Sequence, residues 1–427
     1  MTELNAKTDS KQASAPSPQP PQQVDITIVG GAMAGASLAL GLAKLSAKHA
    51  SLLKRPLSIA LIEAQKPDDN HPGFDSRSIA IAHGSVFELT QLGIWPTIAS
   101  LGSDIENIHI SDRGHFGMTE LNAEQFGLPS MGQVVELAKV GKVLFEQLQQ
   151  ADIKLHCPAS LTQLETDIDG HTITLDNGQQ IRSKLLVAAD GAHSKVRQAL
   201  KQDVTQVEFE QVALVANVET DKPHESWAYE RFTDTGPLAL LPMAPINGKT
   251  RLSLVWALDA EQAQQFKHCD KADFLAALQQ AFGNRAGRFM DVGSRVSYPL
   301  TLSYMPRPIY HRTVFIGNAA QTLHPIAGQG FNLGLRDVVG LIDAVETSIK
   351  AGIENVDLGH NSLIHHYLAS RQQDRMATIN NVEFLVRGFS NQYWPLVAGR
   401  SLGLRLLSWC PPLKAPIAHK AMGWKSA

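Results

Sequence analysis

The feature that most constrains this chain is a glycine-rich turn at residues 30–35, Gly30-Gly31-Ala32-Met33-Ala34-Gly35. A short β-prone run, residues 24–29, precedes it, and leucines at spacings of four and three follow it, at positions 38, 42 and 45. A strand, a glycine turn and an amphipathic helix in this order are typical of a dinucleotide-binding unit. The glycines allow a tight turn and close approach of pyrophosphate, and the helix N-terminus offers N–H groups to the phosphates. Ala32 stands where the usual template has its second glycine.

A carboxylate, that of Glu63, stands at the end of the next predicted strand after the turn. Residues 57–62 are predicted to form the next buried strand, which ends on Glu63. A carboxylate at such a strand end can accept hydrogen bonds from the hydroxyls of an adenosine ribose. Glu63 lies 28 residues after Gly35, against the usual spacing of about 20, and we expect residues 46–57 to form an extended connection. The alternative is a glycine-rich turn in an unrelated α/β protein, which Glu63 makes less favoured.

Two later segments have a similar strand–turn–helix character. Residues 187–197 form a hydrophobic run that ends in an Asp190-Gly191 turn, followed by a serine and a basic helix start. Alone, this segment is an ordinary strand–turn–helix. Residues 317–337 place Asn318 at a strand end, suited to a ribityl hydroxyl, and then turn through Pro325 and Gly328 to Gly330 into a helix. The N-terminus of that helix would face the N1–C2=O edge of a flavin and stabilise negative charge there.

Composition excludes several classes of protein. The 427 residues are enough for two domains of about 100–200 residues each, and a net charge of −3 argues against a nucleic-acid partner. The three cysteines (157, 269 and 410) are far apart and form no C-x-x-C, so we expect reduced thiols in a cytoplasmic protein and no metal site. We predict no membrane span, because no other uniformly apolar stretch approaches about 18 residues.

The order of predicted elements gives an α/β fold. Residues 171–187 form a hairpin around Asp176-Asn177-Gly178, residues 205–260 hold several β-like runs, residues 313–316 form a buried strand, and the chain is helical from about 361. We therefore predict a discontinuous Rossmann-like nucleotide-binding domain with an inserted, mostly antiparallel sheet domain. The predicted boundaries are a disordered tail at 1–23, nucleotide-binding parts at 24–103, 133–203 and 301–355, sheet-domain parts at 104–132 and 204–300, and a C-terminal helical region at 356–427.

These segments together resemble those of the single-component flavin monooxygenases of aromatic rings, which share the p-hydroxybenzoate hydroxylase fold. The run from His324 to Asp337 (H-P-x-x-G-Q-G-x-N-x-G-x-x-D) matches the signature of the ubiquinone-biosynthesis hydroxylases, and the resemblance is greatest to those acting on 2-polyprenyl-6-methoxyphenol. It covers residues 24–427, with further support from 71–81, 109–115, 132–137, 186–194 and 230–243. The wider superfamily usually has Asp and His where this chain has Asn318 and Gln321.

The resemblance implies an FAD enzyme that uses NAD(P)H and O2 to hydroxylate a polyprenylated methoxyphenol. It assigns the 30–35 turn to pyrophosphate, Glu63 to the adenosine ribose, Asp190-Gly191 to FAD and NAD(P)H, and Asn318 to the ribityl chain. The other cofactor-binding residues that it implies are Arg77, Gln133, Gly317, Pro325, Gly328, Gln329, Gly330, Phe331 and Asn332.

Several alternatives stay open. No catalytic side chain is identified; His324 and Pro325 are candidates because they lie in the flavin-type loop, while His83, His115 and His193 are candidates by residue type alone. The enzyme could act on a different ring position of the same pathway or on a small phenol, or the chain could be a flavin-binding scaffold without turnover. Residues 393–413, rich in Trp, Leu and Arg, are either a packed C-terminal helix or a contact with other ubiquinone-biosynthesis proteins or with the inner face of the membrane.

Overall fold

The computed structural model describes residues 20–67, 77–352, 357–389, 394–409 and 422–423. Its first sheet, sheet A, has the order β18-β19-β11-β1-β2-β8, with the hairpin β9–β10 attached to β11. Strands β19, β11, β1, β2 and β8 run parallel. The bounds are β1 Gln22–Val29, β2 Ile59–Ile62, β8 Lys154–His156, β9 Leu161–Asp167, β10 Gly170–Leu175, β11 Gln180–Ala188, β18 Ile309–Tyr310 and β19 Thr313–Phe315.

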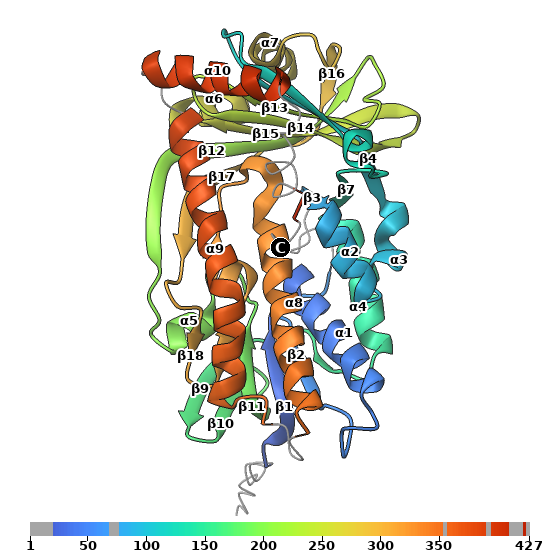
Figure 1. Cartoon of the computed structure of the whole chain (residues 1–427), viewed down its shortest axis with the longest axis vertical. Coiled ribbons are helices and arrows are strands. Elements are labelled where there is room, and N and C mark those ends of the chain that lie inside the picture. Colours follow the sequence, from blue (N-terminus) through green and yellow to red (C-terminus); the bar gives the residue numbers. More distant parts are fainter. Residues whose placement is uncertain (1–19, 68–76, 353–356, 390–393, 410–421, 424–427) are drawn as a thin grey trace, which may run out of the picture.

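Helices pack against sheet A (Figure 1), and their buried apolar side chains share one core with the strands. On α1 the leucines that set the helical period are buried, and they join a core that includes Leu341 and Val338 of α8. Complete burial of one such side chain contributes about 1.5–3 kcal/mol. The helices of this domain are α1 Met33–Lys48, α2 His83–Gln91, α3 Trp95–Ile98, α4 Leu137–Gln150, α5 Lys195–Ala199 and α8 Gln329–Lys350.

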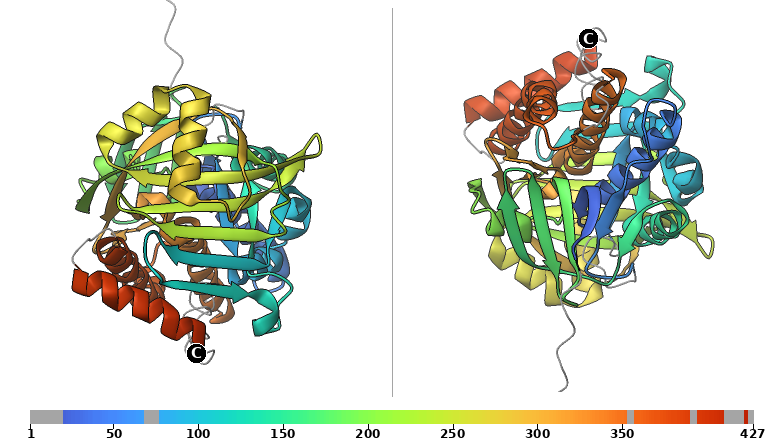
Figure 2. Two further views of the ribbon diagram at one scale, coloured as in Figure 1. Left: turned by 90° about the horizontal axis from the view of Figure 1, so that it is seen from above. Right: turned by 90° about the horizontal axis from the view of Figure 1, so that it is seen from below.

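A second sheet, sheet C, crosses the upper part of the molecule (Figures 1 and 2). Its order is β20-β17-β12-β15-β14-β13-β5-β6, with β16 beside β12. Helices α6 and α7 cover its outer face, where Trp256 and Phe274 are buried. The bounds are β5 Asn107–Asp112, β6 Met118–Asn122, β12 Thr205–Thr220, β13 Trp227–Phe232, β14 Pro237–Ile246, β15 Lys249–Leu258, β16 Phe289–Val292, β17 Val296–Tyr304, β20 Gln321–Thr322, α6 Ala260–His268 and α7 Lys271–Phe282.

A three-stranded sheet, sheet B, and two long helices complete the described chain. Sheet B has the order β3-β7-β4, with bounds β3 Ser78–Ala82, β4 Gly102–Ile105 and β7 Gly132–Glu136. Helix α9 (Asn361–Phe389) runs beside α8, and α10 (Trp394–Trp409) packs against β6 (Figure 1). The 3-10 turns are η1 Ala99–Leu101, η2 Ala123–Phe126, η3 Gly317–Ala319 and η4 Ile326–Gly328.

The predicted α/β architecture with scattered nucleotide-binding elements is confirmed, but several boundaries differ. Strand β1 begins at Gln22 and pairs with β11 from there, so the end of the predicted tail is ordered; residues 1–19 lie outside the described residues. The predicted connection at 46–57 starts later, because α1 continues to Lys48. The predicted boundary at 300/301 falls inside β17, which pairs with β12 through Tyr304. One pairing in sheet C, β5 with β13, is parallel.

Candidate functional site

The glycine turn after β1 is set by close backbone contacts. Gly30 has φ +102°, and its N–H donates to the carbonyl of Ile62 over 2.8 Å. A Cβ on Gly30 would overlap the carbonyl oxygen of Ala189, and a Cβ on Gly35 would overlap that of Gly30. These two positions therefore require glycine. Ala32 has φ −69°, an ordinary value, so its methyl group strains nothing in the backbone.

The start of helix α1 presents an open, positive end. Among the residues that the structure describes, no side chain caps this N-terminus, and the first turn of the helix holds no acidic residue. The first N–H groups of a helix lack intrahelical partners, and the helix dipole places partial positive charge beside them. The turn and the helix start together form a cradle for an anionic group such as a pyrophosphate.

Glu63 lies against the glycine turn, where β2 ends. Its Oε2 accepts a hydrogen bond from the Gly31 N–H at 2.6 Å, and its Oε1 accepts one from the Gln65 N–H at 3.0 Å. The residue is only 8% exposed. Each carboxylate oxygen has a second lone pair, so Glu63 can hold the turn and still accept hydroxyl groups of a ribose.

The Asp190-Gly191 turn lies next to the glycine turn, because β11 is the parallel neighbour of β1. The Ala189 N–H donates to the carbonyl of Val29 over 2.7 Å. Asp190 Oδ2 accepts from the Val196 N–H at 3.2 Å, whereas Oδ1 is buried without a hydrogen-bond partner among the described residues. Burial raises the pKa of Asp190. Its free oxygen is a buried acceptor that a ligand donor would satisfy.

Arg197 joins the second segment to the third, and sequence inspection did not single it out. Its guanidinium donates to the carbonyl of Ala319 at 2.8 Å and to that of Ala192 at 2.5 Å. Ser194 caps the same short helix by accepting from the Arg197 N–H. The basic start of the helix at 195–197 was the available signal, and its function is to tie two loops together.

The third segment continues from β19 along the same edge of sheet A. The Ile316 N–H donates to the carbonyl of Ala188, and Gly317, with φ +55°, lies under helix α1, where a Cβ would be 3.3 Å from the Cβ of Ala34. Asn318 follows with an exposed side chain. All three predicted segments therefore meet at the carboxyl edge of one parallel sheet, the usual place for ligands in such folds.

Asn332 has a positioning role that the sequence did not indicate. Its Oδ1 accepts from the Ala82 N–H at 2.9 Å, and its Nδ2 donates to the carbonyls of Ala80 (3.1 Å) and Gly328 (2.7 Å). Gly328 has φ +61°, and a Cβ there would be 3.3 Å from the Cβ of Ala80. The buried amide thus fixes β3 against the loop before α8.

The remaining predicted cofactor residues surround this loop at different depths. Pro325 is exposed, whereas Gln329, Gly330 and Phe331 are half-buried in the first turn of α8. The Arg77 guanidinium lies 5.1 Å from the ring centroid of Tyr298 in sheet C. Gln133 is in β7, and its buried Oε1 has no hydrogen-bond partner among the described residues. Arg77 thus contacts sheet C, whereas Gln133 belongs to sheet B.

The four candidate histidines are not brought together. His324 is 1% exposed; its Nδ1 accepts from the Ile326 N–H at 3.2 Å, and its ring meets Phe209 edge to face at 5.7 Å. Burial lowers the pKa of His324 to about 4, so it is neutral near pH 7. His83 begins α2, His115 lies beside Asp112 (3.3 Å), and His193 is exposed.

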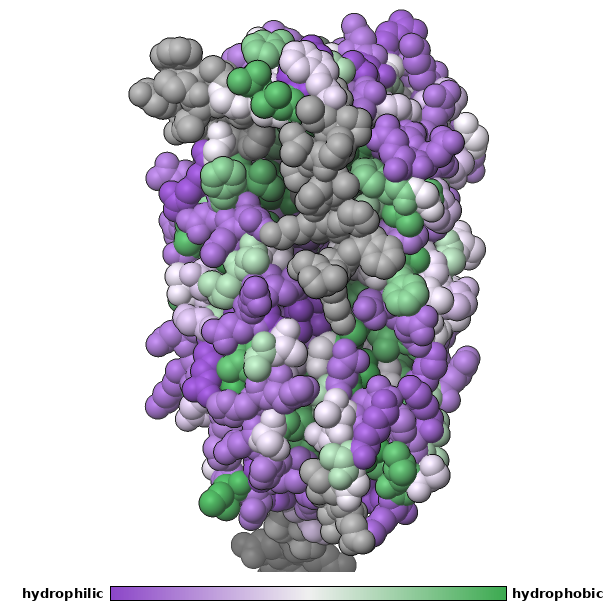
Figure 3. Space-filling model, viewed as in Figure 1, coloured by the Kyte–Doolittle hydropathy of each residue, from purple (hydrophilic) through white to green (hydrophobic). Residues whose placement is uncertain are grey.

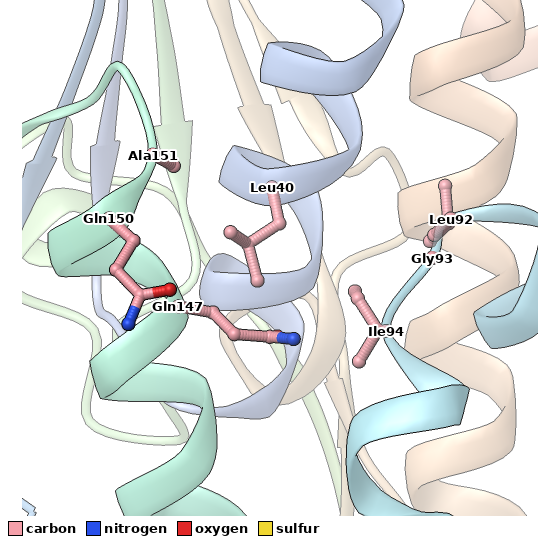
Figure 4. A pocket seen from close by; sticks show the side chains of 7 residues that line it. All are labelled: Leu40, Leu92, Gly93, Ile94, Gln147, Gln150 and Ala151. Atoms are coloured by element: carbon pink, nitrogen blue, oxygen red, sulfur yellow. The ribbon is translucent and has the colours of Figure 1, made fainter.

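One surface pocket lies away from this edge, among α1, α4 and the segment after α2 (Figure 4). No charged side chain contributes to its lining, which consists of Leu40, Leu92, Gly93, Ile94, Gln147, Gln150 and Ala151. None of the predicted cofactor residues lines it, and it offers no ionisable group for chemistry.

Comparisons with known proteins agree with this geometry. A family model described as FAD binding domain matches residues 23–373. The chain is 33% identical to "Ubiquinone hydroxylase UbiL" of Rhodospirillum rubrum, covering 93% of this chain and 89% of that protein. It is 29% identical to "3-demethoxyubiquinol 3-hydroxylase" of Escherichia coli, with 94% and 99% covered. Its fold is similar to that of p-nitrophenol 4-monooxygenase PnpA from Pseudomonas putida (TM-score 0.73, 14% identity, 95% and 100% covered).

Proposed function

The chain belongs to the FAD-binding-domain family of flavin-dependent monooxygenases, and on that premise we propose that it hydroxylates a polyprenylated methoxyphenol in ubiquinone biosynthesis. NAD(P)H would supply the electrons and O2 the oxygen atom. The names of the two curated relatives support the pathway. The ring position rests on the overall resemblance of the sequence to the methoxyphenol hydroxylases.

The observation that carries the proposal is the meeting of three distant segments at one sheet edge. The 30–35 turn and the N-terminus of α1 would hold the FAD pyrophosphate, and Glu63 the adenosine ribose. Asp190 offers its free buried oxygen to FAD or to NAD(P)H. The isoalloxazine would lie beside the loop at 325–330, which Asn332 fixes against β3. When bound, FAD supplies the redox chemistry, and these residues orient it.

The substrate would lie between this loop and the inner face of sheet C, the face opposite α6 and α7. Phe232 and Leu302 of sheet C pack there with Leu323 and Ile326 of the loop. Such apolar surroundings suit an aromatic ring with a prenyl tail and exclude water from the reaction.

The decisive experiment combines a cofactor test with a lipid test. Purified protein should be yellow with bound FAD, and a 2-methoxyphenol with a geranyl tail should stimulate its oxidation of NAD(P)H. Deletion of the gene should cause the polyprenyl-methoxyphenol to accumulate, as identified by mass spectrometry. Accumulation of a different quinone precursor would reassign the ring position, and a normal quinone profile would refute the pathway.

Helix α10 supports a second part of the proposal, peripheral contact with the membrane that holds the prenylated substrate. Ser401 and Leu404 are buried against the protein, whereas Leu402 (51%), Leu406 (44%) and Trp409 (67%) are exposed at positions i, i+4 and i+7. In Figure 3 a few hydrophobic residues lie at the top of the molecule, where α10 runs in Figure 1, among hydrophilic ones. No helix in the described part of the chain is long and apolar enough to span a membrane, so contact would be through this face, at the interface.

Vesicle binding tests this contact. Replacing Leu402 and Trp409 by serine should reduce co-sedimentation with vesicles of phosphatidylethanolamine and phosphatidylglycerol by several-fold. The matched control is Ile168→Ser, because Ile168 is 80% exposed in the β9–β10 turn, far from α10 in Figure 1. Equal binding by all three proteins would rule out a membrane contact through α10.

A further inference from the structure

Glu230 is an ionisable side chain on the inner face of sheet C, in strand β13. Successive side chains of a strand point to opposite faces, and Tyr229 packs on the outer face against Phe282. Glu230 therefore shares the inner face with Ala228 and Phe232. Its neighbours in register are Ile110 of β5 and Ala239 of β14.

The two inner-face neighbours of Glu230 locate it over the loop before α8. Ala228 packs with Ala80 of β3 and with residues of β4 and β7. Phe232 packs with Leu323 and Ile326. Asn332 holds β3 and this loop together, so Glu230 lies over their junction, which is where the proposed function puts the aromatic ring of the substrate.

The Glu230 carboxyl group has little to stabilise its negative charge. Its Oε1 is buried and has no hydrogen-bond partner among the described residues, and the residue is half-buried as a whole. Burial alone raises its pKa to about 7, so no neighbouring charge contributes. Of the two strands that flank Glu230, β14 carries no ionisable side chain, while β5 carries His109, in register with Tyr229 of the outer face, and Asp112, in register with Phe232 of the inner face. His324 lies in the loop before α8.

We propose that Glu230 is a catalytic residue, the acceptor of the phenolic proton of the substrate. This assignment rests on the proposed function, because it requires a phenol between the loop and sheet C. A carboxylate that lacks a protein partner can accept a proton from a substrate hydroxyl, and a proton acceptor is most effective when its proton affinity matches the working pH.

The proton transfer balances within the hydroxylation. The phenolic O–H bond breaks, its proton moves to the Glu230 carboxylate, and its electron pair increases the electron density of the ring. A ring carbon then forms a bond to one oxygen atom derived from O2 while the bond between the two oxygen atoms breaks. That carbon loses its own hydrogen as a proton, which restores the aromatic ring, and Glu230 returns its proton to the phenolate oxygen. NAD(P)H supplies two electrons, the ring supplies two, and the second oxygen atom leaves as water.

His324, the nearest candidate that the sequence offered, is less suited to this role. Its Nδ1 already accepts the Ile326 N–H, its ring packs against Phe209, and its low pKa keeps it from holding a proton at neutral pH. Glu230, in contrast, has a carboxylate oxygen, Oε1, that is engaged in no hydrogen bond among the described residues.

The test compares Glu230→Gln, Glu230→Asp and the control Glu208→Gln in the FAD-loaded enzyme. Glu208 is exposed in β12 of the same sheet, where Val207 and Phe209 face inward. With the geranyl methoxyphenol, Glu230→Gln should lower kcat by about a hundredfold or more at pH 7, while FAD content stays unchanged. Its rate should recover at high pH, where the phenol ionises by itself. Glu230→Asp should retain part of the rate, and Glu208→Gln all of it.

A second readout needs no turnover. The infrared carboxyl band that is lost in Glu230→Gln should titrate in the oxidised holoenzyme well above the range of an ordinary glutamate. Titration in the ordinary range would overturn the assignment, as would a wild-type pH profile in Glu230→Gln. If the wild type neither binds FAD nor oxidises NAD(P)H with phenols, the proposed function fails by itself. If Glu230→Gln does not fold, the same two measurements on Glu230→Asp test the assignment: its kcat at pH 7 should be lower than that of the wild type, and its carboxyl band should be shifted.

Discussion

Neutralising Asp337 should lower the free energy of unfolding strongly, because this side chain connects Arg371 of α9 with Gln321 of β20. It is 1% exposed; its Oδ1 accepts from Arg371 Nε at 3.2 Å, and its Oδ2 accepts from Gln321 Nε2 at 2.6 Å. Gln321 Oε1 in turn accepts from Arg375 Nε at 2.6 Å. The substitution Asp337→Asn keeps the shape, but it offers one acceptor oxygen to two donors and leaves buried positive charge less compensated.

The burial of Asp337 sets the size of the stability loss that Asp337→Asn should cause. Breaking a buried ion pair by removing one partner costs about 3–5 kcal/mol. We expect the lower end, about 3 kcal/mol, because Arg371 keeps a 2.6 Å ion pair with Asp374. At about 2 °C per kcal/mol for a chain of this size, the midpoint of thermal unfolding should fall by roughly 5 °C or more. Total stabilities are only about 5–15 kcal/mol, so the loss is large.

Asp374→Asn is the matched control. Asp374 also pairs with Arg371, and with Arg336 at 2.9 Å, but its side chain is 42% exposed. Water and salt screen such pairs, so this change should cost about 1 kcal/mol or less, and less still at high salt. Calorimetry and urea unfolding of the holoenzyme would measure both variants at low and high salt. An Asp337→Asn cost no greater than that of Asp374→Asn would refute the reasoning.

Three further changes have defined outcomes. Gly35→Ala should abolish retention of FAD on gel filtration, because the new Cβ would overlap the Gly30 carbonyl. The control Gly403→Ala, which has open space around its Cβ, should retain FAD. Equal retention by both variants would contradict the assignment of the 30–35 turn to the FAD pyrophosphate. His324 has a folded-state pKa of about 4, below its ordinary 6.5, so its stabilising contribution is complete above pH 6.5 and decreases toward pH 4; His324→Phe should flatten that decrease in urea titrations. Hydrogen bonds from Lys48, His49 and Lys350 lower the pKa of Glu346 from 4.5 to about 2. Glu346→Gln should therefore have a lower free energy of unfolding than the wild type above pH 4.5, and the two values should converge as the pH falls toward 2. A difference in unfolding free energy that does not change with pH would contradict this.

The parts of the site that sequence could predict are those made by backbone. Gly30 and Gly35 are required by contacts between neighbouring turns, and such contacts leave a local spacing of glycines that can be recognised. The turn at Asp176-Asn177-Gly178 likewise joins β10 to β11 as predicted, since its conformation depends on the residues within it. Parallel neighbours in sheet A then bring Asp190 and Gly317 to the same edge.

The parts that sequence could not predict depend on pairing between distant elements. Asn332 lies within the predicted loop motif, yet its amide is directed to β3, about 250 residues earlier in the chain. Glu230 lies in a strand whose inner face is defined only once β5 pairs beside it and α7 covers the other side. Helical or alternating periods indicate that a residue faces a core, but they do not identify which of two cores.

Gln321 stands where the wider superfamily usually has a histidine. The hydrogen bonds that Gln321 makes with Asp337 and Arg375 explain why this replacement is compatible with the fold. Its amide accepts from Arg375 at one end and donates to Asp337 at the other. A neutral histidine, which the wider superfamily usually has at this position, also carries one donor and one acceptor, on its two ring nitrogens. The side chain differs while the polarity of the bridge stays the same, and α9 remains connected to the flavin-loop segment. Asn318, in contrast, is exposed, and its side chain has no hydrogen-bond partner among the described residues. Compared with aspartate it keeps one acceptor oxygen and gains two donor hydrogens, so only the ligand would distinguish the two residues.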